Sequence, residues 1–142
     1  MNHVKQIVRF VTSNWGNRMA VQWISNIMLA VHVGLGTAVL AGGAGRFPYP
    51  TYQPLVEIVD GRVWIWGVWI MASAGLMMIP ARWPQIAGLW LGMTWQIMWC
   101  AAFAVAVVKY PAAGATAAVA YGGFALIDVA LLTARIVDRD RG

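Results

Sequence analysis

Four long runs of apolar residues, separated by short polar segments, dominate the sequence. The runs cover about residues 20–41, 63–79, 86–108 and 113–136. No Lys, Arg, Asp or Glu lies between Arg18 and Arg46, or between Arg82 and Lys109. Uncharged apolar runs of this length meet the ~18-residue criterion for a helix that crosses a bilayer. The pattern predicts an all-α integral membrane protein, a four-helix bundle that forms a single domain over residues 1–142.

Residues 4–18 show the pattern of an amphipathic helix. Apolar residues recur with helical spacing at Val4, Ile7, Val8, Val11 and Trp15, with polar residues on the other side. This pattern predicts a helix that lies in the membrane interface, the alternative being a soluble segment packed on the bundle. The first apolar run is too long for the core of a signal peptide, so the first span is expected to act as its own signal anchor.

The cations predict the orientation of the four spans. With an even number of spans, both termini share one side of the membrane. That side carries seven cations, Lys5, Arg9, Arg18, Arg82, Arg135, Arg139 and Arg141, and the other carries three, Arg46, Arg62 and Lys109. Positive residues accumulate on the cytoplasmic side. We therefore expect a multi-pass protein of the inner (cytoplasmic) membrane with both termini in the cytoplasm.

The polar segment at residues 43–62 is then an outer loop. It carries closely spaced prolines and tyrosines, namely Pro48, Tyr49, Pro50, Tyr52 and Pro54. Proline fixes φ near −65°, which favours an extended, polyproline-like backbone, and tyrosine suits the headgroup layer. These residues predict a stiff strap that links the first two spans and offers a contact surface to a partner.

Small residues recur at four-residue spacing in three of the runs. They are Ala30, Gly34, Ala38 and Gly42 in the first, Gly88 and Gly92 in the third, and Gly114, Ala118 and Gly122 in the fourth. Such faces let helix backbones approach closely in lipid. Two interpretations are open: packing within one bundle, or association of protomers into a homo-oligomer.

A few polar side chains lie inside the predicted spans: Gln22, Asn26, His32, Gln96 and Asp128. Intramembrane ionisable groups are candidates for function. Counting depth along each helix at ~1.5 Å per residue, we expect a layer of His32 with Gln96 and a second of Asn26 with Asp128, rather than a direct His32–Asp128 pair. The layers would either set helix packing through hydrogen bonds or form a path for protons or ions.

Composition excludes several classes of function. The chain is 61% hydrophobic and 11% charged, and the net charge of +5 comes from cations at the ends of apolar runs, which indicates the lipid bilayer and not nucleic acid as partner. Two histidines and one cysteine offer no metal or haem site, and no catalytic motif is present. The sequence predicts no cofactor, no catalytic residues and no enzyme. The nine tryptophans are expected at the interfaces or packed against protein and lipid, with a stacking platform for a flat ligand as the alternative.

The stretch HVGLGTAVLAGGAGRFPYPTYQPLVEIVDGRVWIWGVWIMASAGLMM, from His32 to Met78, resembles small multi-span membrane proteins of actinobacterial phages. The resemblance rests on the Phe-Pro-x-Pro loop at residues 47–50 and the Trp-x-Trp-Gly motif at 64–67, and covers about a third of the chain. Such proteins commonly lie near lysis genes and are regarded as holin-like. Since holins have no catalytic motif, the resemblance transfers no functional residue.

Together these features predict a holin-like protein that oligomerises in the host inner membrane and permeabilises it during phage lysis. No span carries a strongly polar stripe that would line a water-filled lesion. The alternative is therefore a non-lytic interaction module, such as a superinfection-exclusion factor or an accessory subunit, that binds another membrane protein.

Overall fold

Helices, joined by short turns and bends, make up almost all the residues that the structure describes. The computed structural model describes residues 18–47, 50–110 and 115–137. Its longer helices are α2 (Arg18–Gly42), α4 (Trp64–Met78), α5 (Arg82–Lys109) and α6 (Thr116–Val137); the 3₁₀ turns η1 (Gly43–Arg46) and η2 (Pro50–Tyr52) and helix α3 (Gln53–Ile58) connect α2 to α4. The all-helical prediction is confirmed for this part of the chain. The predicted interfacial helix at 4–18 lies outside the described residues, apart from Arg18.

Three of these helices have the length and apolar character of membrane spans. They are the segments Ala20–Gly42, Arg82–Lys109 and Thr116–Ile136. Helix α4 is also apolar but has only 15 residues. At ~1.5 Å per residue it is ~22 Å long, against ~30 Å for a typical hydrocarbon core. The chain has the character of a membrane protein with three full-length candidate spans and one shorter apolar helix.

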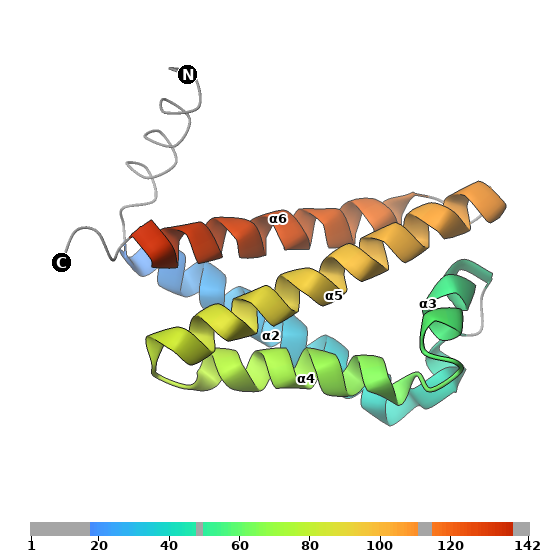
Figure 1. Ribbon diagram of the computed structural model, residues 1–142, viewed down its shortest axis with the longest axis horizontal. Coiled ribbons are helices and arrows are strands. Elements are labelled where there is room, and N and C mark those ends of the chain that lie inside the picture. Colours follow the sequence, from blue (N-terminus) through green and yellow to red (C-terminus); the bar gives the residue numbers. More distant parts are fainter. Residues whose placement is uncertain (1–17, 48–49, 111–114, 138–142) are drawn as a thin grey trace, which may run out of the picture.

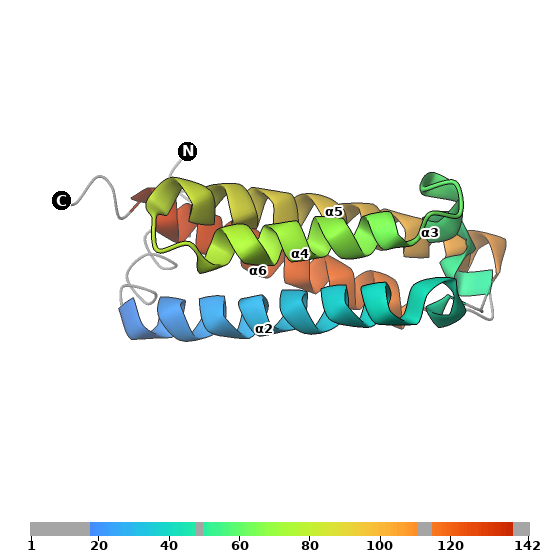
Figure 2. The ribbon, with the colours of Figure 1, turned by 90° about the horizontal axis from the view of Figure 1, so that it is seen from below.

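The four longer helices lie side by side, with α5 between two of the others (Figures 1 and 2). Helix α5 packs against both α4 and α6, and α2 packs mainly against α4. Helix α2 begins at the end of the molecule where α6 ends, whereas α3 lies at the opposite end (Figure 1). Only residues 79–81 separate α4 from α5. Pro84 fits the first turn of α5 because N–H groups there have no acceptor within the helix.

Two apolar clusters fill the interior, one toward each end. The cluster at the α3 end is rich in aromatic rings, and Trp99 lies 5.9 Å from Trp66 and 5.6 Å from Trp95, edge to face in both pairs. Its buried members are Val39, Leu55, Val63, Trp66, Ile70, Trp95, Trp99, Ala102 and Phe103. The cluster at the other end is aliphatic and consists of Met28, Ile86, Leu89, Leu131 and Leu132. On α2, His32 lies between Met28 of the aliphatic cluster and Val39 of the aromatic cluster.

The connection between α2 and α4 is helical where it is described, and the predicted extended strap is wrong for those residues. Pro50 begins η2 and Pro54 lies in the first turn of α3; Pro48 and Tyr49 lie outside the described residues. The φ angle of proline suits the first turn of a helix as well as a polyproline strand. Proline spacing alone therefore could not distinguish the two. The segment reverses before α4 through Asp60 and Gly61, which have φ angles of 51° and 74°.

The connecting segment is fastened to the aromatic cluster. Trp66 is fully buried and its Nε1 donates a hydrogen bond to the carbonyl oxygen of Leu55 at 2.9 Å. The Tyr52 ring lies edge to face against Phe47 and Phe103, at 5.2 and 5.4 Å. Tyr52 therefore covers the end of the bundle interior and does not simply point to the headgroup layer.

We predict that Leu55→Ala destabilises the fold by about 2–5 kcal/mol, because it leaves a cavity under the aromatic cluster. Leu55 is 0% exposed, whereas Ile58 on the same short helix is 51% exposed. The matched control Ile58→Ala should change the free energy of unfolding by less than about 0.5 kcal/mol. Titration of the detergent-solubilised protein with a denaturing detergent, followed by tryptophan fluorescence, measures both. Equal effects of the two substitutions would contradict the packing described.

Candidate functional site

A polar layer crosses the interior between the two apolar clusters. It contains one side chain from each of the four longer helices, His32 from α2, Ser73 from α4, Gln96 from α5 and Asp128 from α6, and all four are completely buried. Buried polar groups in an apolar surrounding are expensive unless they find partners. The layer is therefore the candidate functional site.

The imidazole of His32 is the centre of this layer. Its Nδ1 donates to the carbonyl oxygen of Met28 at 2.7 Å, which places a proton on Nδ1 because a carbonyl can only accept. Its Nε2 lies 3.5 Å from Nε2 of Gln96 and 3.7 Å from Oδ2 of Asp128. The amide N–H of Gln96 requires a bare Nε2, whereas a carboxylate requires a proton there. The two neighbours thus favour opposite protonation states of the ring.

The predicted layers are partly wrong. His32 and Gln96 are neighbours, as expected, but Asp128 joins them. Asn26 instead accepts a hydrogen bond from Gln22 at 3.1 Å, at an exposed position of α2. The predicted depths were those of the Cα atoms. Each Cα–Cβ bond of a helix, however, tilts toward the N-terminus of that helix, so the side chain lies at a different depth from its Cα. Because α2 and α6 run in opposite directions, the side chains of His32 and Asp128 lean toward each other and close the offset between their backbones.

Glycines in α5 make room for the layer. A Cβ atom on Gly92 would lie 2.7 Å from Nε2 of His32 and 2.8 Å from Oδ2 of Asp128. A Cβ on Gly88 would lie 2.9 Å from the backbone oxygen of Ser73. The hydroxyl of Ser73 in turn donates to the carbonyl oxygen of Gly88 at 2.8 Å. The predicted small-residue pair Gly88 and Gly92 therefore packs inside the molecule and does not face a second protomer.

Several buried polar atoms of the site have no hydrogen-bond partner among the described residues. They are both carboxylate oxygens of Asp128, Oε1 of Gln96, and Nε1 of Trp95 and Trp99. The Trp95 ring meets the His32 ring edge to face at 5.3 Å. Polar atoms that lack a hydrogen-bond partner in an apolar interior destabilise the fold. A water molecule or a proton that supplies the missing hydrogen bonds would remove this cost. His32 and Asp128 are the ionisable groups of this layer, and Nε2 of His32 lies 3.7 Å from Oδ2 of Asp128.

The site offers nothing resembling a metal centre among the residues that the structure describes, where no three His, Cys, Asp or Glu side chains converge. The lone Cys100 is free and half-buried.

The small-residue face predicted for the first span is turned outward. Ala30 and Gly34 are exposed, Ala38 and Gly42 are half-buried, and a Cβ on Gly34 would meet nothing within 4 Å. Gly36 serves the internal contact instead, since a Cβ there would lie 2.8 Å from Sδ of Met71. On α6, Ala118 and Gly122 are half-buried, and Gly114 lies outside the described residues.

Sequence reasoning missed Ser73, although it is a lone polar residue in an apolar run. Serine can satisfy itself by bonding to its own helix, and so its contact with α5 had no clear signal. The remaining predicted polar residues, Gln22 and Asn26, lie near the start of α2, away from the layer. They line a separate pocket.

Fold and site together define an all-helical protein, over the residues described, with three candidate membrane spans and a buried polar layer. Comparisons of the chain with protein-family models, with curated proteins and with solved structures found no match.

We predict that Gly92→Ala destabilises the protein by about 1–3 kcal/mol, because the added methyl group overlaps His32 and Asp128. Gly123 on α6 is the control, since it is exposed and a Cβ there meets nothing within 4 Å. Gly123→Ala should be neutral or stabilise the helix by up to about 1 kcal/mol. Unfolding in mixed detergent micelles compares them. A Gly92→Ala protein as stable as the wild type would show that the layer is not closely packed.

Proposed function

We propose that the protein is a holin-like membrane protein, which spans the inner membrane four times with both termini in the cytoplasm. In this proposal α4, together with its flanking residues, supplies the fourth crossing of a four-helix bundle. Copies of the protein associate laterally and permeabilise the host membrane during phage lysis. The observation that carries the proposal is the outward orientation of the small-residue face on α2.

The outward face of α2 supports lateral association. Internal packing does not use Ala30 and Gly34, so their regular spacing is left without a role inside the monomer. In lipid, small residues promote helix association because backbones can approach closely there. A second copy of the chain, presenting the same face, is the simplest partner for such a surface.

The length of α4 supports a membrane-disturbing role. Its 15 residues are short for a bilayer, and a short span is accommodated by local thinning of the bilayer. Many associated copies would concentrate this thinning in one patch. The neighbouring α5 has 28 residues and is long for a bilayer. Each protomer therefore contains one helix that is short and one that is long for the same membrane.

The polar layer would supply the wall of the lesion. Because His32, Gln96 and Asp128 are buried in the described conformation, the monomer presents mainly apolar helix surfaces to lipid. Separation of the helices would expose these side chains to water, where the unpartnered oxygens of Asp128 and Gln96 gain hydrogen bonds. In this proposal the closed protomer is lipid-soluble, and the assembled one opens at its polar layer.

The second candidate is a non-lytic module that binds another membrane protein. It is favoured by the enclosure of the polar layer, and by the exposed Glu57 and Ile58 on α3, which a partner could contact. In this alternative the polar layer only holds the helices together.

Controlled expression in a bacterial host distinguishes these candidates. A holin-like protein should cause an abrupt loss of membrane potential after a delay, measured with a potential-sensitive dye alongside cell density. An inactive membrane protein expressed at the same level is the control. Unchanged growth and potential at confirmed expression in the membrane would contradict the holin proposal and favour the interaction module.

We predict that Gly34→Leu weakens self-association about tenfold, because the new side chain keeps the α2 backbones of two copies apart. Gly123→Leu places the same bulk at an exposed glycine on α6 and should leave association unchanged. Cross-linking in membranes at graded expression levels measures the oligomer fraction, and the delay before potential loss should lengthen for Gly34→Leu only. Identical oligomers from both variants would refute an assembly face on α2.

A further inference from the structure

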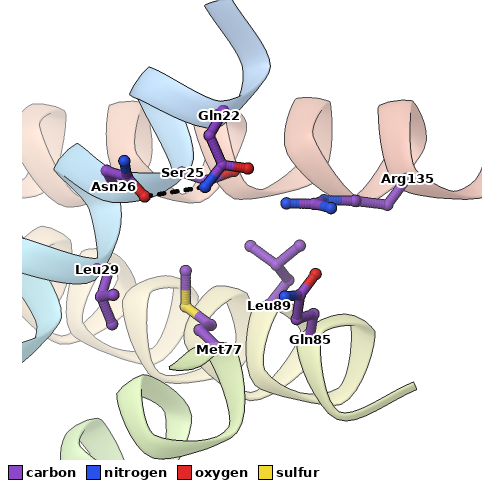
Figure 3. Close-up of a pocket in the computed structure, with 8 residues that line it drawn as sticks. All are labelled: Gln22, Ser25, Asn26, Leu29, Met77, Gln85, Leu89 and Arg135. Atoms are coloured by element: carbon purple, nitrogen blue, oxygen red, sulfur yellow. Dashed lines mark hydrogen bonds between the residues drawn. The ribbon is translucent and has the colours of Figure 1, made fainter. Parts of the chain in front are cut away.

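A pocket opens between the helices at the end where α2 begins and α6 ends. Figure 3 shows that all four longer helices contribute to it. Its lining residues are Gln22, Ser25, Asn26, Leu29, Met77, Gln85, Leu89 and Arg135. Its volume is about 40 Å³, and since a water-sized atom needs ~10–15 Å³ on this measure, about three such atoms fit. The pocket is separate from the polar layer and has no role in the proposed permeabilisation.

The lining combines one cation with several neutral hydrogen-bonding groups. The guanidinium group of Arg135 points into the pocket toward Gln22 and Gln85 (Figure 3). Its Nε is buried and has no hydrogen-bond partner among the described residues. The amides of Gln22, Asn26 and Gln85 and the hydroxyl of Ser25 add further polar groups, and Nε2 of Gln22 donates to Oδ1 of Asn26. Arg135 therefore has room for an acceptor that the described part of the chain does not provide.

No described carboxylate is placed to fill that role. Glu57 and Asp60 belong to the connection at the α3 end, and Asp128 is buried in the polar layer. A second cation lies close by instead, because Nη2 of Arg82 is 3.5 Å from the backbone oxygen of Arg135 and donates to it. Arg82 and Arg135, the charged side chains described at this end, are both cations, which favours an anion beside them.

The position of the pocket indicates which anion it meets. Arg135 is in the last turn of α6, Gln22 is near the start of α2, and Met77 is near the end of α4. In the proposed membrane placement, on which this inference rests, these helix ends lie at the headgroup level of the bilayer. Leu29, Met77 and Leu89 add apolar surface to the lining, beside which the apolar part of a lipid can lie outside the pocket.

We propose that this pocket binds the phosphate group of an anionic phospholipid from the leaflet at this end. The guanidinium of Arg135 donates to the phosphate oxygens, with the hydroxyl of Ser25 and the amide of Gln85 as further donors beside them. Planar guanidinium groups match phosphate with paired hydrogen bonds. A lipid held in this way connects α2 with α5 and α6.

Lipid retention by the purified full-length protein tests the site. The protein in mild detergent is titrated with phosphatidylglycerol, and bound lipid is counted by native mass spectrometry while thermal unfolding is recorded. We expect one tightly retained phosphatidylglycerol and a raised unfolding temperature. Arg135→Gln should weaken this binding at least about tenfold, because a charge-assisted contact is lost. Gln85→Leu should weaken it less, and Lys109→Gln, at the opposite end of α5, should have no effect.

Two further arms identify the source of the phosphate and the role of charge. Inorganic phosphate at millimolar concentration should not stabilise the protein; stabilisation equal to that by phosphatidylglycerol would overturn the lipid as ligand. Equal retention of zwitterionic phosphatidylcholine would overturn the selectivity for an anionic lipid.

A third arm tests whether the chain neutralises its own pocket. Asp138 and Asp140 follow Arg135 in the sequence. Retention that appears only in the double variant Asp138→Asn, Asp140→Asn would overturn the proposal, because the tail carboxylates and not a lipid would then be the ligands of Arg135. Retention by the wild type that is lost in Arg135→Gln supports it, and retention unaffected by either pocket substitution refutes it.

Discussion

A single buried acid sets the main constraint on this structure. Placing an aspartate in the middle of an apolar span costs ~2.5–3.5 kcal/mol on the insertion scale, so α6 gains little from lipid alone. Asp128 is fully buried and lies 3.7 Å from His32. Helix α6 therefore depends on the surface that the other helices provide, and the glycine at position 92 leaves the space in which that surface meets the carboxylate.

The rest of the interior insulates the polar layer. An aromatic cluster that includes Trp66, Trp95 and Trp99 packs on one side of the layer, and an aliphatic cluster packs on the other. Two exposed threonines form hydrogen bonds within their own helices. The hydroxyl groups of Thr94 and Thr133 donate to backbone carbonyl oxygens four residues earlier, at 2.7 and 2.8 Å. Among the described residues, most of the buried polar atoms without a hydrogen-bond partner belong to Asp128, Gln96, Trp95 and Trp99, in or beside the polar layer.

Helix α2 takes part in the polar layer, in the proposed assembly face and in the pocket, because its faces make different contacts. One face carries His32 and Gly36 into the interior, another presents Ala30 and Gly34 outward, and its first turns border the pocket beside Arg135. A shift of α2 relative to α6 would change the polar layer and the pocket together. Lipid at the pocket and a second protomer at the outward face would act on the same helix from different sides.

The sequence by itself determined the helical, membrane-type architecture and the identity of most of the polar layer. Length and absence of charge suffice to mark a span, and few polar residues are available inside one, so His32, Gln96 and Asp128 could be named in advance. Tertiary structure decided how these residues combine. Side chains of antiparallel helices lean toward each other, which brought Asp128 to His32 and not to Asn26. The helix rotations turned Gly34 outward and Gly92 inward, a distinction that spacing alone cannot make. Prolines at 50 and 54 were compatible with a strand or a helix start, and packing of Leu55 beneath the aromatic rings selected the helix.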